Sequence, residues 1–438
     1  MTASTPVAEA RAPGADGKSA SWTCPFCSLL CDDFSVDAGA ELRLRGSNCA
    51  RAQAGLAQFG ADLATVSASI DGASASTDAA LDAAATRIAA ARQPLFGGLA
   101  TDVAGMRALY ALADASGAIL DHAHGDTLMH SLRALQDKGL FYTTLAEIRN
   151  RADLVVCLGT DPRARYPEFF RRCAPAAGSA DTREVVFLGS KEADSGVEVT
   201  GASRVEHLSA DGDLFDVAAR LAARLSGRQA AADEGAGDEL GALAARMQAA
   251  RYCVIVWEAG TLPRHGALIG EAVLRMVNTL NRSTRAGAFC LTGSEGAYSA
   301  NYVSTWMSGL PLRSGVFARG LEHDPVRFAA TRLLADGAVD ALLWVSSFGA
   351  EPAVPASALP TVVLGHPAQA KALAGRSNIV FIPVSTPGIG SAGHLFRADG
   401  GVVVPLNAVR DDGLPTVAAL AAQLRTRVRA IHNGEGAR

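Results

Sequence analysis

The sequence predicts an α/β protein built from doubly wound parallel sheets. Short apolar runs rich in Val, Ile, Leu and Phe recur along the chain, and each is followed by Gly, Ser, Thr or Asp. Such runs are typical of central strands in parallel sheets, which are buried on both faces. Segments of helical period separate the runs, as expected for βαβ units. A chain of 438 residues is long enough for two or three packed domains.

The predicted elements alternate along the chain. A helical pattern at Thr77–Arg92 leads to the apolar run Pro94–Leu99, and a second pattern at Val103–Ser116 leads to Ala118–Asp121. Further strands are expected at Asp153–Leu158, Glu184–Leu188, Tyr252–Trp257, Asp340–Val345, Thr361–Leu364 and Asn378–Val384. Further helices are expected at Leu214–Leu225, Ala267–Leu280, Val326–Ala335 and Thr416–His432.

Composition divides the chain into segments. Residues 1–20 are rich in Ala, Pro, Gly and Ser and contain no apolar run, so we expect a disordered tail rather than a secretory signal. The polar, acidic segment Ser226–Asp238 is typical of a linker between two domains. We therefore expect a small four-cysteine lobe at 21–70, a first α/β domain at 71–230, a second at 240–400, and a C-terminal strand and helix at 401–438.

Charge and hydropathy exclude several classes of function. The net charge is −4, which argues against nucleic acid as the main partner because phosphate binding needs a basic surface. No stretch approaches the roughly 20 apolar residues that span a bilayer, so we expect no membrane contact. These features predict a soluble, cytoplasmic protein. In that compartment the eight cysteines serve as thiols or metal ligands rather than as disulfides.

Four cysteines lie close together near the N-terminus. Cys24, Cys27, Cys31 and Cys49 form the pattern C-x2-C-x3-C-x17-C. Three thiolates on one loop and a fourth from downstream can bind a [4Fe-4S] cluster. The same thiolates can bind zinc, although zinc sites more often consist of two C-x2-C pairs, and coincidence is the third interpretation. The other four cysteines are scattered and are predicted to be core thiols: Cys157, Cys173, Cys253 and Cys290.

The cysteine-containing passage Cys24–Asp33 resembles the N-terminal cluster motif in the B subunits of formylmethanofuran dehydrogenases, which are members of the molybdopterin oxidoreductase superfamily. Segments similar to that family follow at Asn150–Pro162, Thr305–Pro311 and Ile382–Gly388. The resemblance therefore spans nearly the whole chain after residue 21. It implies that the doubly wound sheets form a molybdopterin-oxidoreductase-like multi-domain arrangement.

Two family residues of the active centre are missing. In the family a cysteine followed by His-Gly binds molybdenum or tungsten, whereas here Ala123 takes that position, before His124. A methyl group cannot coordinate a metal, and His124 is expected to be a structural hydrogen-bonding residue. Alignment on Trp306 places Thr292 where the family has an active-site arginine, and threonine carries no charge. These losses predict a degenerate site without catalytic residues and without molybdopterin or tungstopterin.

With these losses the chain resembles the beta subunit of the bacterial formyltransferase/hydrolase complex. The resemblance implies a non-catalytic scaffold in a complex that converts formyl-tetrahydromethanopterin to formate through methylofuran, a carrier with a polyglutamate tail. It also implies amidohydrolase-like, formyltransferase and gamma subunits as partners. Two alternatives remain. One is an active formylmethanofuran dehydrogenase chain with a tungsten or molybdenum pterin and a [4Fe-4S] cluster, and the other is a cluster-bearing electron-transfer module.

Four arginines follow the predicted strand Asp153–Leu158, at the strand end where α/β folds bind ligands. Guanidinium groups bind carboxylates bidentately, so a polyglutamate tail would suit a patch of arginines. The alternative is a solvated loop, or one that docks on another subunit. The arginines concerned are Arg163, Arg165, Arg171 and Arg172.

Two other patterns are interpreted as structural. Gly388–Gly393 satisfies G-x-G-x-x-G, but a dinucleotide site needs a helix directly afterwards, and the following residues predict a turn and a strand. Asp32 and Asp33 stand beside Cys31, where a cap or turn role is expected rather than acid–base catalysis. No Ser–His–Asp order or histidine-rich cluster indicates a hydrolase.

Overall fold

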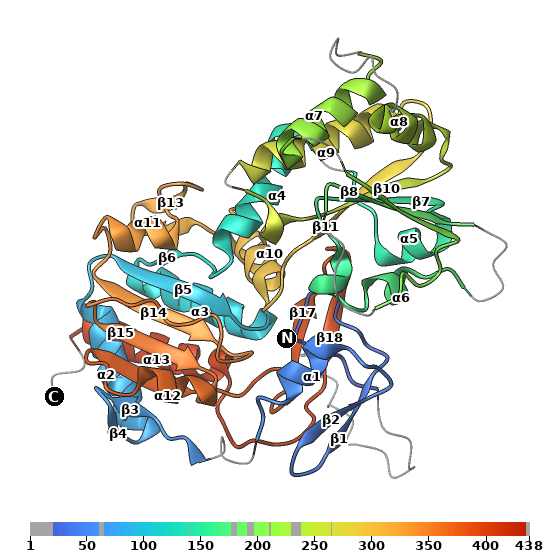
Figure 1. Ribbon diagram of the computed structural model, residues 1–438. Helices are drawn as coiled ribbons and strands as arrows, with labels where there is room; N and C mark the ends of the chain where they lie inside the picture. The colour runs from blue at the N-terminus through green and yellow to red at the C-terminus, as the bar shows by residue number, and fades with distance from the viewer. Residues whose placement is uncertain are drawn as a thin grey trace, which may run out of the picture.

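The computed structural model describes residues 21–60, 65–139, 141–176, 182–190, 197–209, 212–228, 238–263 and 265–434. Two α/β lobes, each built on one sheet, lie side by side, and a small cysteine-containing lobe packs against both (Figure 1). The predicted tail at 1–20 and most of the predicted linker lie outside the described residues. Among the residues described, no helix is both long and apolar enough to cross a membrane.

The larger sheet has nine strands in the order β13-β12-β6-β5-β14-β15-β16-β3-β4. Its five central strands are parallel: β6 (Ile119–Leu120), β5 (Pro94–Ala100), β14 (Ala341–Ser346), β15 (Thr361–Gly365) and β16 (Ile379–Pro383). Antiparallel hairpins close its edges: β12 (Ser314–Phe317) with β13 (Gly320–His323), and β3 (Ser69–Ile70) with β4 (Ala73–Ser74).

Apolar side chains cover both faces of this sheet, as the continuous apolar runs predict. One face packs against α2 (Thr77–Ala90), α3 (Val103–Ser116) and α13 (Val417–His432). The other face packs against the shorter α11 (Ala330–Ala335) and α12 (Ala370–Leu373). Ser76, Asp102 and Thr416 cap the three long helices by accepting a backbone N–H from the first turn.

The smaller sheet has five parallel strands in the order β11-β10-β7-β8-β9. They are β11 (Ala286–Leu291), β10 (Cys253–Glu258), β7 (Leu154–Leu158), β8 (Glu184–Leu188) and β9 (Arg204–Leu208). One face packs against α4 (Gly125–Lys138), α7 (Leu214–Leu225), α8 (Glu239–Ala249) and α9 (Gly266–Leu280) (Figure 1). The other face packs against α5 (Leu145–Arg151), α6 (Phe169–Cys173) and the cysteine lobe.

The cysteine lobe consists of the antiparallel hairpin β1 (Ser35–Ala38) and β2 (Leu42–Arg45), followed by α1 (Ala50–Leu56). The late hairpin β17 (Gly393–Phe396) and β18 (Val403–Leu406) lies against it. The Trp22 indole N–H donates to the Gly388 carbonyl at 2.7 Å, and the Ala398 N–H donates to the Ser28 carbonyl at 2.8 Å. The beginning of the described chain is therefore joined to the segment around Gly388 and Ala398.

The predicted α/β class is confirmed, but strand pairing corrects the predicted domain bounds. β5 and β6 from segment 71–230 join the larger sheet, whereas β7, β8 and β9 from the same segment pair with β10 and β11. The predicted linker Ser226–Asp238 instead connects α7 to α8, which cover one sheet. An apolar run identifies a strand but not its neighbours, so the sequence could not place these boundaries.

One predicted helix is shorter than expected. The pattern at Val326–Ala335 predicted a helix over ten residues, but α11 begins at Ala330. The Asp324 carboxylate accepts the backbone N–H groups of Val326 and Arg327, at 2.9 and 2.7 Å. A side chain that bonds its own neighbouring backbone favours a turn over a helix.

Candidate functional site

The two segments that the sequence assigns to a degenerate centre meet between the lobes. The loop after β6 carries Ala123 and His124 into α4, and the loop after β11 carries Thr292 toward α10 (Ala297–Ser308). The His124 Nε2 lies 3.1 Å from the Glu295 Oε2. His124 and Thr292 line one cavity, so loops that are far apart in the sequence form one site.

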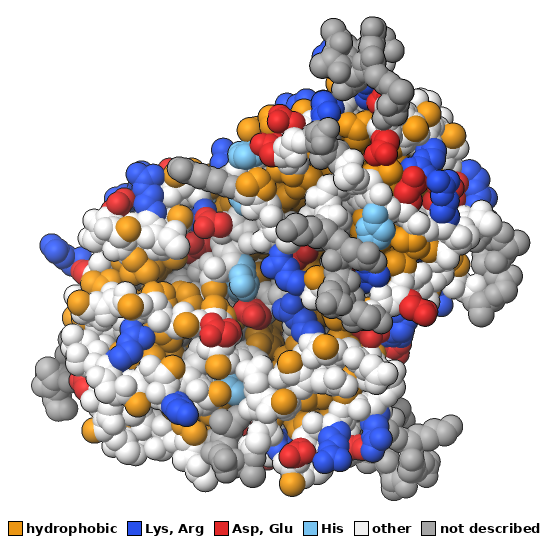
Figure 2. Space-filling view, viewed as in Figure 1, with side chains coloured by type: hydrophobic (Ala, Val, Ile, Leu, Met, Phe, Trp, Pro, Cys, Tyr) orange, Lys and Arg blue, Asp and Glu red, His pale blue; other side chains and the backbone are white. Residues whose placement is uncertain are grey.

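This small cavity has a volume of about 180 Å³ and lies in a hollow where Figure 2 shows basic, acidic and histidine side chains together. Ala123 is not among its lining residues, because the half-buried Ala123 packs against an apolar cluster of the larger sheet. The Ala123 N–H donates to the Gly98 carbonyl at 3.0 Å. The lining consists of Arg51, His124, Thr127, Arg165, Tyr166, Glu258, Gly260, Thr292, Gly293, Ser294 and Glu295.

The backbone of the loop before α4 is held by buried polar groups. The His122 Nδ1 accepts the His124 N–H at 3.0 Å, and burial lowers the pKa of His122 to about 3, so its ring is neutral. The Asp121 carboxylate accepts the Arg313 Nε–H at 3.3 Å and the Ala330 N–H at 2.7 Å. Burial raises the pKa of Asp121 to about 6 despite the neighbouring guanidinium. These hydrogen bonds fix the backbone of the loop before α4.

Gly125 is required for this packing. A Cβ at Gly125 would lie 2.2 Å from the Asp121 Oδ1, closer than real side chains come. The glycine that follows His124 therefore lets the first turn of α4 approach the Asp121 carboxylate.

Glu258 and Arg51 are cavity residues that the sequence did not single out. Glu258, which is 3% exposed, accepts the Arg165 Nε–H at 2.5 Å and the Thr160 hydroxyl at 2.9 Å. Burial raises the pKa of Glu258. The Arg51 guanidinium donates to the Phe26 carbonyl at 2.7 Å and to the Arg165 carbonyl at 3.3 Å. A carboxylate at the end of a buried strand was the one signal in the sequence that could have found Glu258.

The charges of the small cavity largely neutralise one another. Arg165 pairs with Glu258, and His124 lies against Glu295. The buried Thr292 hydroxyl has no hydrogen-bond partner among the described residues. The described lining contains no cysteine.

The four clustered cysteines share one apolar core. Cys24, Cys27, Cys31 and Cys49 are each at most 7% exposed. The Cys24 N–H donates to the Cys31 carbonyl at 2.9 Å, which closes the loop. Burial raises the pKa of Cys24, and the nearby thiols of Cys27, Cys31 and Cys49 raise it further. The donor types therefore suit a soft metal, but in the described part of the chain no three His, Cys, Asp or Glu side chains are placed to hold a metal ion.

The four predicted arginines do not form one patch. Arg163 is buried and binds Asp161 bidentately, at 2.6 and 3.0 Å. Arg165 alone lines the small cavity. Arg171 pairs with Asp33 at 2.6 Å, and Arg172 pairs with Asp32 at 2.5 Å.

These last pairs give Asp32 and Asp33 a role that the sequence did not indicate. Both carboxylates bind the arginines of α6, so they tie the cysteine loop to the smaller sheet's lobe. The carboxylates were far from the arginines in the sequence, which hid the pairing. Binding of a carrier by the arginines stays a prediction.

The glycine pattern at Gly388–Gly393 ends in a strand, as predicted. Its first residues form a turn, in which the Gly388 N–H donates to the Ser391 carbonyl at 2.7 Å. β17 begins at Gly393, so no helix follows to bind a pyrophosphate.

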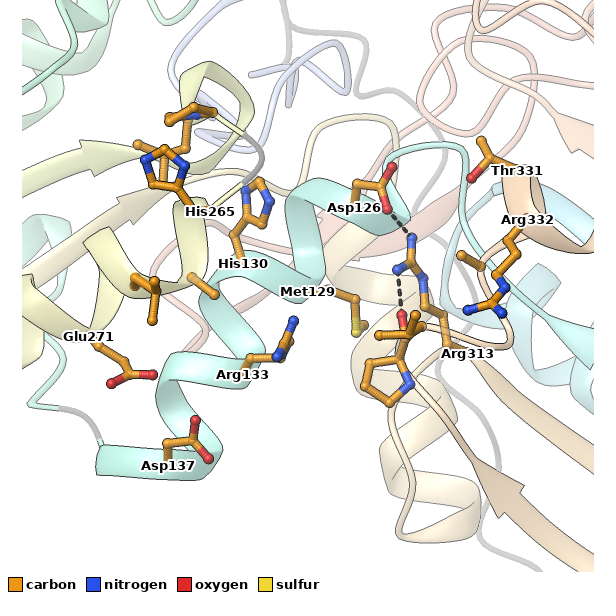
Figure 3. A pocket seen from close by; sticks show the side chains of 17 residues that line it. Asp126, Met129, His130, Arg133, Asp137, His265, Glu271, Arg313, Thr331 and Arg332 are labelled. Atoms are coloured by element: carbon orange, nitrogen blue, oxygen red, sulfur yellow. Dashed lines mark hydrogen bonds and ion pairs between the residues drawn. The ribbon is translucent and has the colours of Figure 1, made fainter. Parts of the chain in front are cut away.

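A larger cavity of about 870 Å³ lies on the other side of the first turn of α4. Figure 3 shows that α4, α9 and the segment before α11 surround it. The Arg313 guanidinium donates to the Asp126 Oδ1 and to the Pro325 carbonyl, both at 2.6 Å, and so joins the two lobes. Arg133, Arg313 and Arg332 are offset by Asp126, Asp137 and Glu271 in the lining. This mixture of charges indicates no single ligand class.

Comparisons with known proteins agree with the geometry. No family model matches the chain. Among the B subunits of known complexes, that of the formyltransferase/hydrolase complex Fhc from Methylorubrum extorquens is 32% identical over 373 residues, which cover 83% of this chain and 97% of the relative. That of the tungsten-containing formylmethanofuran dehydrogenase 2 from Methanocaldococcus jannaschii is 26% identical over 416 residues, which cover 89% and 93%.

A solved structure has a similar fold. It is the crystal structure of the formyltransferase/hydrolase complex FhcABCD from Methylorubrum extorquens, determined in complex with methylofuran. One of its chains is 30% identical to this one and superposes with a TM-score of 0.72, covering 84% of this chain and 100% of that chain. The likeness therefore extends over the whole of the matched chain.

Proposed function

The chain belongs to the family of B subunits found in the formyltransferase/hydrolase complex and in formylmethanofuran dehydrogenase, and from this premise we propose that it is a non-catalytic scaffold in a formyltransferase/hydrolase complex. In this proposal, amidohydrolase-like, formyltransferase and gamma subunits complete the assembly. The assembly converts formyl-tetrahydromethanopterin to formate through methylofuran in the cytoplasm. The eight free cysteines agree with that compartment.

The observation that carries the proposal is Ala123. It occupies the position at which the family's cysteine binds molybdenum or tungsten, and its methyl group packs on the apolar core of the larger sheet. Thr292, at the family's arginine position, contributes a neutral hydroxyl that is buried without a partner among the described residues. A site that has lost both its metal donor and its fixed positive charge supports positioning of other subunits, not redox chemistry.

We further propose that the four clustered thiols hold a structural metal, either iron in a [4Fe-4S] cluster or zinc. Four buried cysteines on one lobe supply the ligands that both groups use. Binding would deprotonate thiols whose pKa burial raises, and that cost is met by metal–sulfur bonding. The metal would stabilise the cysteine lobe without passing electrons.

We propose contact with the methylofuran carrier only for the solvent-exposed arginines of the predicted patch. The side chains of Arg165 and Arg171 are 44% and 39% exposed, whereas those of Arg163 and Arg172 are 10% and 14% exposed. Replacement of Arg165 by Glu should lower the amount of methylofuran retained by the purified complex. The matched control is Arg43→Glu on β2, because Arg43 is also an exposed arginine but lies far from Arg165 in the sequence. Equal retention in both variants would remove the carrier contact from the proposal.

The test of the main proposal is native purification of the tagged chain from its own cells. We expect an amidohydrolase-like chain and a formyltransferase to co-purify with it, and the assembly to release formate from a formylated carrier. Reduction of a viologen dye by the formylated carrier should be absent. Dye reduction would instead favour the second candidate, an active formylmethanofuran dehydrogenase chain, which the similarity to the tungsten-containing relatives supports.

A further inference from the structure

We propose that the outer face of α10, with the strand edge next to it, docks a different subunit of the complex, with Trp306 as the central anchor. The inference rests on the proposed function and adds the place of contact. The Trp306 surface consists of Phe141, Tyr142, Tyr302, Trp306 and Met307.

The tyrosines of this surface are neighbours. The side chains of Tyr142 and Tyr302 interact with each other, and Tyr302 stacks on Tyr298 with ring centroids 5.6 Å apart. Trp306 follows Tyr302 by one helical turn, so both lie on the same face of α10. The aromatic row therefore runs from the buried Tyr298 outward to Trp306.

Trp306 and the apolar residues that adjoin this row in the chain are unusually exposed for large apolar groups. Trp306 is 64% exposed, Phe141 52% and Met307 42%. Single exposed apolar side chains are common, but a cluster that includes tryptophan marks an interaction surface. Tryptophan and methionine are enriched at the cores of protein interfaces, and tryptophan dominates binding energy there.

The backbone that carries Trp306 is fixed before any partner binds. The Ser304 hydroxyl donates to the Leu310 carbonyl at 3.1 Å, and the Asn301 side-chain oxygen accepts the Leu312 N–H at 3.1 Å. Gly309 ends α10 with φ of +78°, a conformation that favours glycine. Because the helix end is already ordered, docking loses little conformational entropy.

Charge identifies the chemistry of the partner. The exposed Arg107 of α3 lies 5.7 Å from the Trp306 ring centroid. No carboxylate among the described residues pairs with Arg107. The surface therefore fits a protein that offers an apolar pocket with a carboxylate at its rim.

A second copy of this chain fits less well than a different subunit. A two-fold contact through this surface would place Arg107 and Trp306 of one copy against the same residues of the other. Two unpaired guanidinium groups would then enter one interface and repel each other. The similar solved structure is an assembly of different subunits, which agrees with a different chain as the occupant.

The test is co-expression of the full chain with the other subunits and capture on a tag placed on this chain. Trp306→Glu should make capture of one other subunit weaker, about thirtyfold, as expected for loss of an interface hot spot. Trp306→Ala and Arg107→Glu should weaken it in the same direction with smaller factors. Ile431→Glu on α13 is the matched control, because Ile431 is also exposed, at 39%, but on another helix. Thermal melting checks that every variant is folded.

The outcomes separate the inference from the function on which it rests. If the wild type captures its partners and folded Trp306→Glu and Trp306→Ala capture them equally well, the docking surface is wrong and the proposed function stands. If the wild type captures no other subunit, the proposed function fails and the inference fails with it. If the purified chain is a dimer that Trp306→Glu dissociates, the occupant is a second copy and the inference is overturned.

Discussion

The cysteine loop and the loop before α4 are both held by charged groups, but they present different side chains. The cysteine loop keeps all four sulfur donors, and the Asp32 and Asp33 carboxylates next to it pair with Arg172 and Arg171. The loop before α4 is held by hydrogen bonds through His122 and Asp121 and carries the Ala123 methyl group, at the position where the resemblance predicts a metal donor in the family. The first loop thus presents four sulfur donors, whereas the second presents none.

This difference indicates what each region does for the protein. Arg313, just before β12, pairs with Asp121 and Asp126, so it ties the larger sheet to the loop before α4 and to the first turn of α4. For the four clustered thiols, the function that we propose is to hold a structural metal. In the proposed function no redox centre is served, so the proposed metal is structural rather than electron-carrying.

The largest effect should come from the cysteine loop. Cys24→Ser should remove the proposed metal and destabilise the cysteine lobe by more than about 5 kcal/mol, because structural metal sites supply folding energy of that order or more. Cys253→Ser in β10 is the matched control, and should cost about 1–3 kcal/mol for burying a hydroxyl. Iron, zinc and sulfide analysis with urea unfolding measures both. Equal losses in the two variants would show that the clustered thiols are ordinary core residues.

A large effect should also follow from the loop before α4. Arg313→Ala leaves the Asp121 carboxylate buried without its cation, so the free energy of unfolding should fall by about 3–5 kcal/mol. Arg332→Ala serves as control, since Arg332 lines the same cavity but pairs with Asp336 at the surface, and should cost at most about 1 kcal/mol. Denaturant titration compares them. A tolerated Arg313→Ala would mean that the loop no longer supports the packing of the lobes.

Acid should affect the loop before α4 through two opposing groups. The pKa of His122 is lowered from 6.5 to about 3 in the folded chain. Between these pH values only the unfolded chain binds this proton, so the free energy of unfolding falls as the pH falls. The pKa of Asp121 is raised to about 6 from 3.8, so between these values the folded chain binds the proton and stability rises as pH falls. The two trends partly cancel in the wild type.

Replacement of His122 by Gln should unmask the second trend. The quantity compared is the change in the free energy of unfolding when the pH is lowered from 7 to 5. In the variant this change should be more favourable to the folded state by about 1–2 kcal/mol than in the wild type. Unfolding titrations at several pH values provide the measurement. An unchanged pH slope would show that His122 is not held neutral by burial.

The smallest effect should come from restoring the lost donor. Ala123→Cys places a thiol on a half-buried position among apolar neighbours, so stability should change by no more than about 0.5 kcal/mol. We expect no tungsten or molybdenum to be gained, because the arginine position at Thr292 is also lost. Elemental analysis of the variant complex checks this. Uptake of either metal would mean that one side chain alone separates this chain from its redox relatives.

The sequence predicted single helices and strands better than it predicted contacts between segments that are distant in the chain. An apolar run located β8 and a helical pattern located α7, both with the bounds observed, and the cysteine pattern located the loop now seen to be buried. The order of strands in each sheet could not be predicted, because an apolar run does not indicate which strands will pair with it. The pairing of Glu258 with Arg165 could not be predicted for the same reason, since the two residues come from the ends of different strands.

The exposed Trp306 illustrates a second limit of the sequence. A tryptophan inside a helical pattern is expected to be buried, because tryptophan is highly buried on average. Only the placement of α10 shows that its outer end faces solvent. The proposed docking surface can thus be identified from the fold but not from the sequence pattern.

The account depends most on the absence of a redox metal at Ala123, and metal content tests that directly. The complex should be purified natively from cells supplied with both tungstate and molybdate, and both metals should be measured per chain. The account predicts that neither metal exceeds a small fraction of the chain concentration. Tungsten or molybdenum at one atom per chain would contradict it.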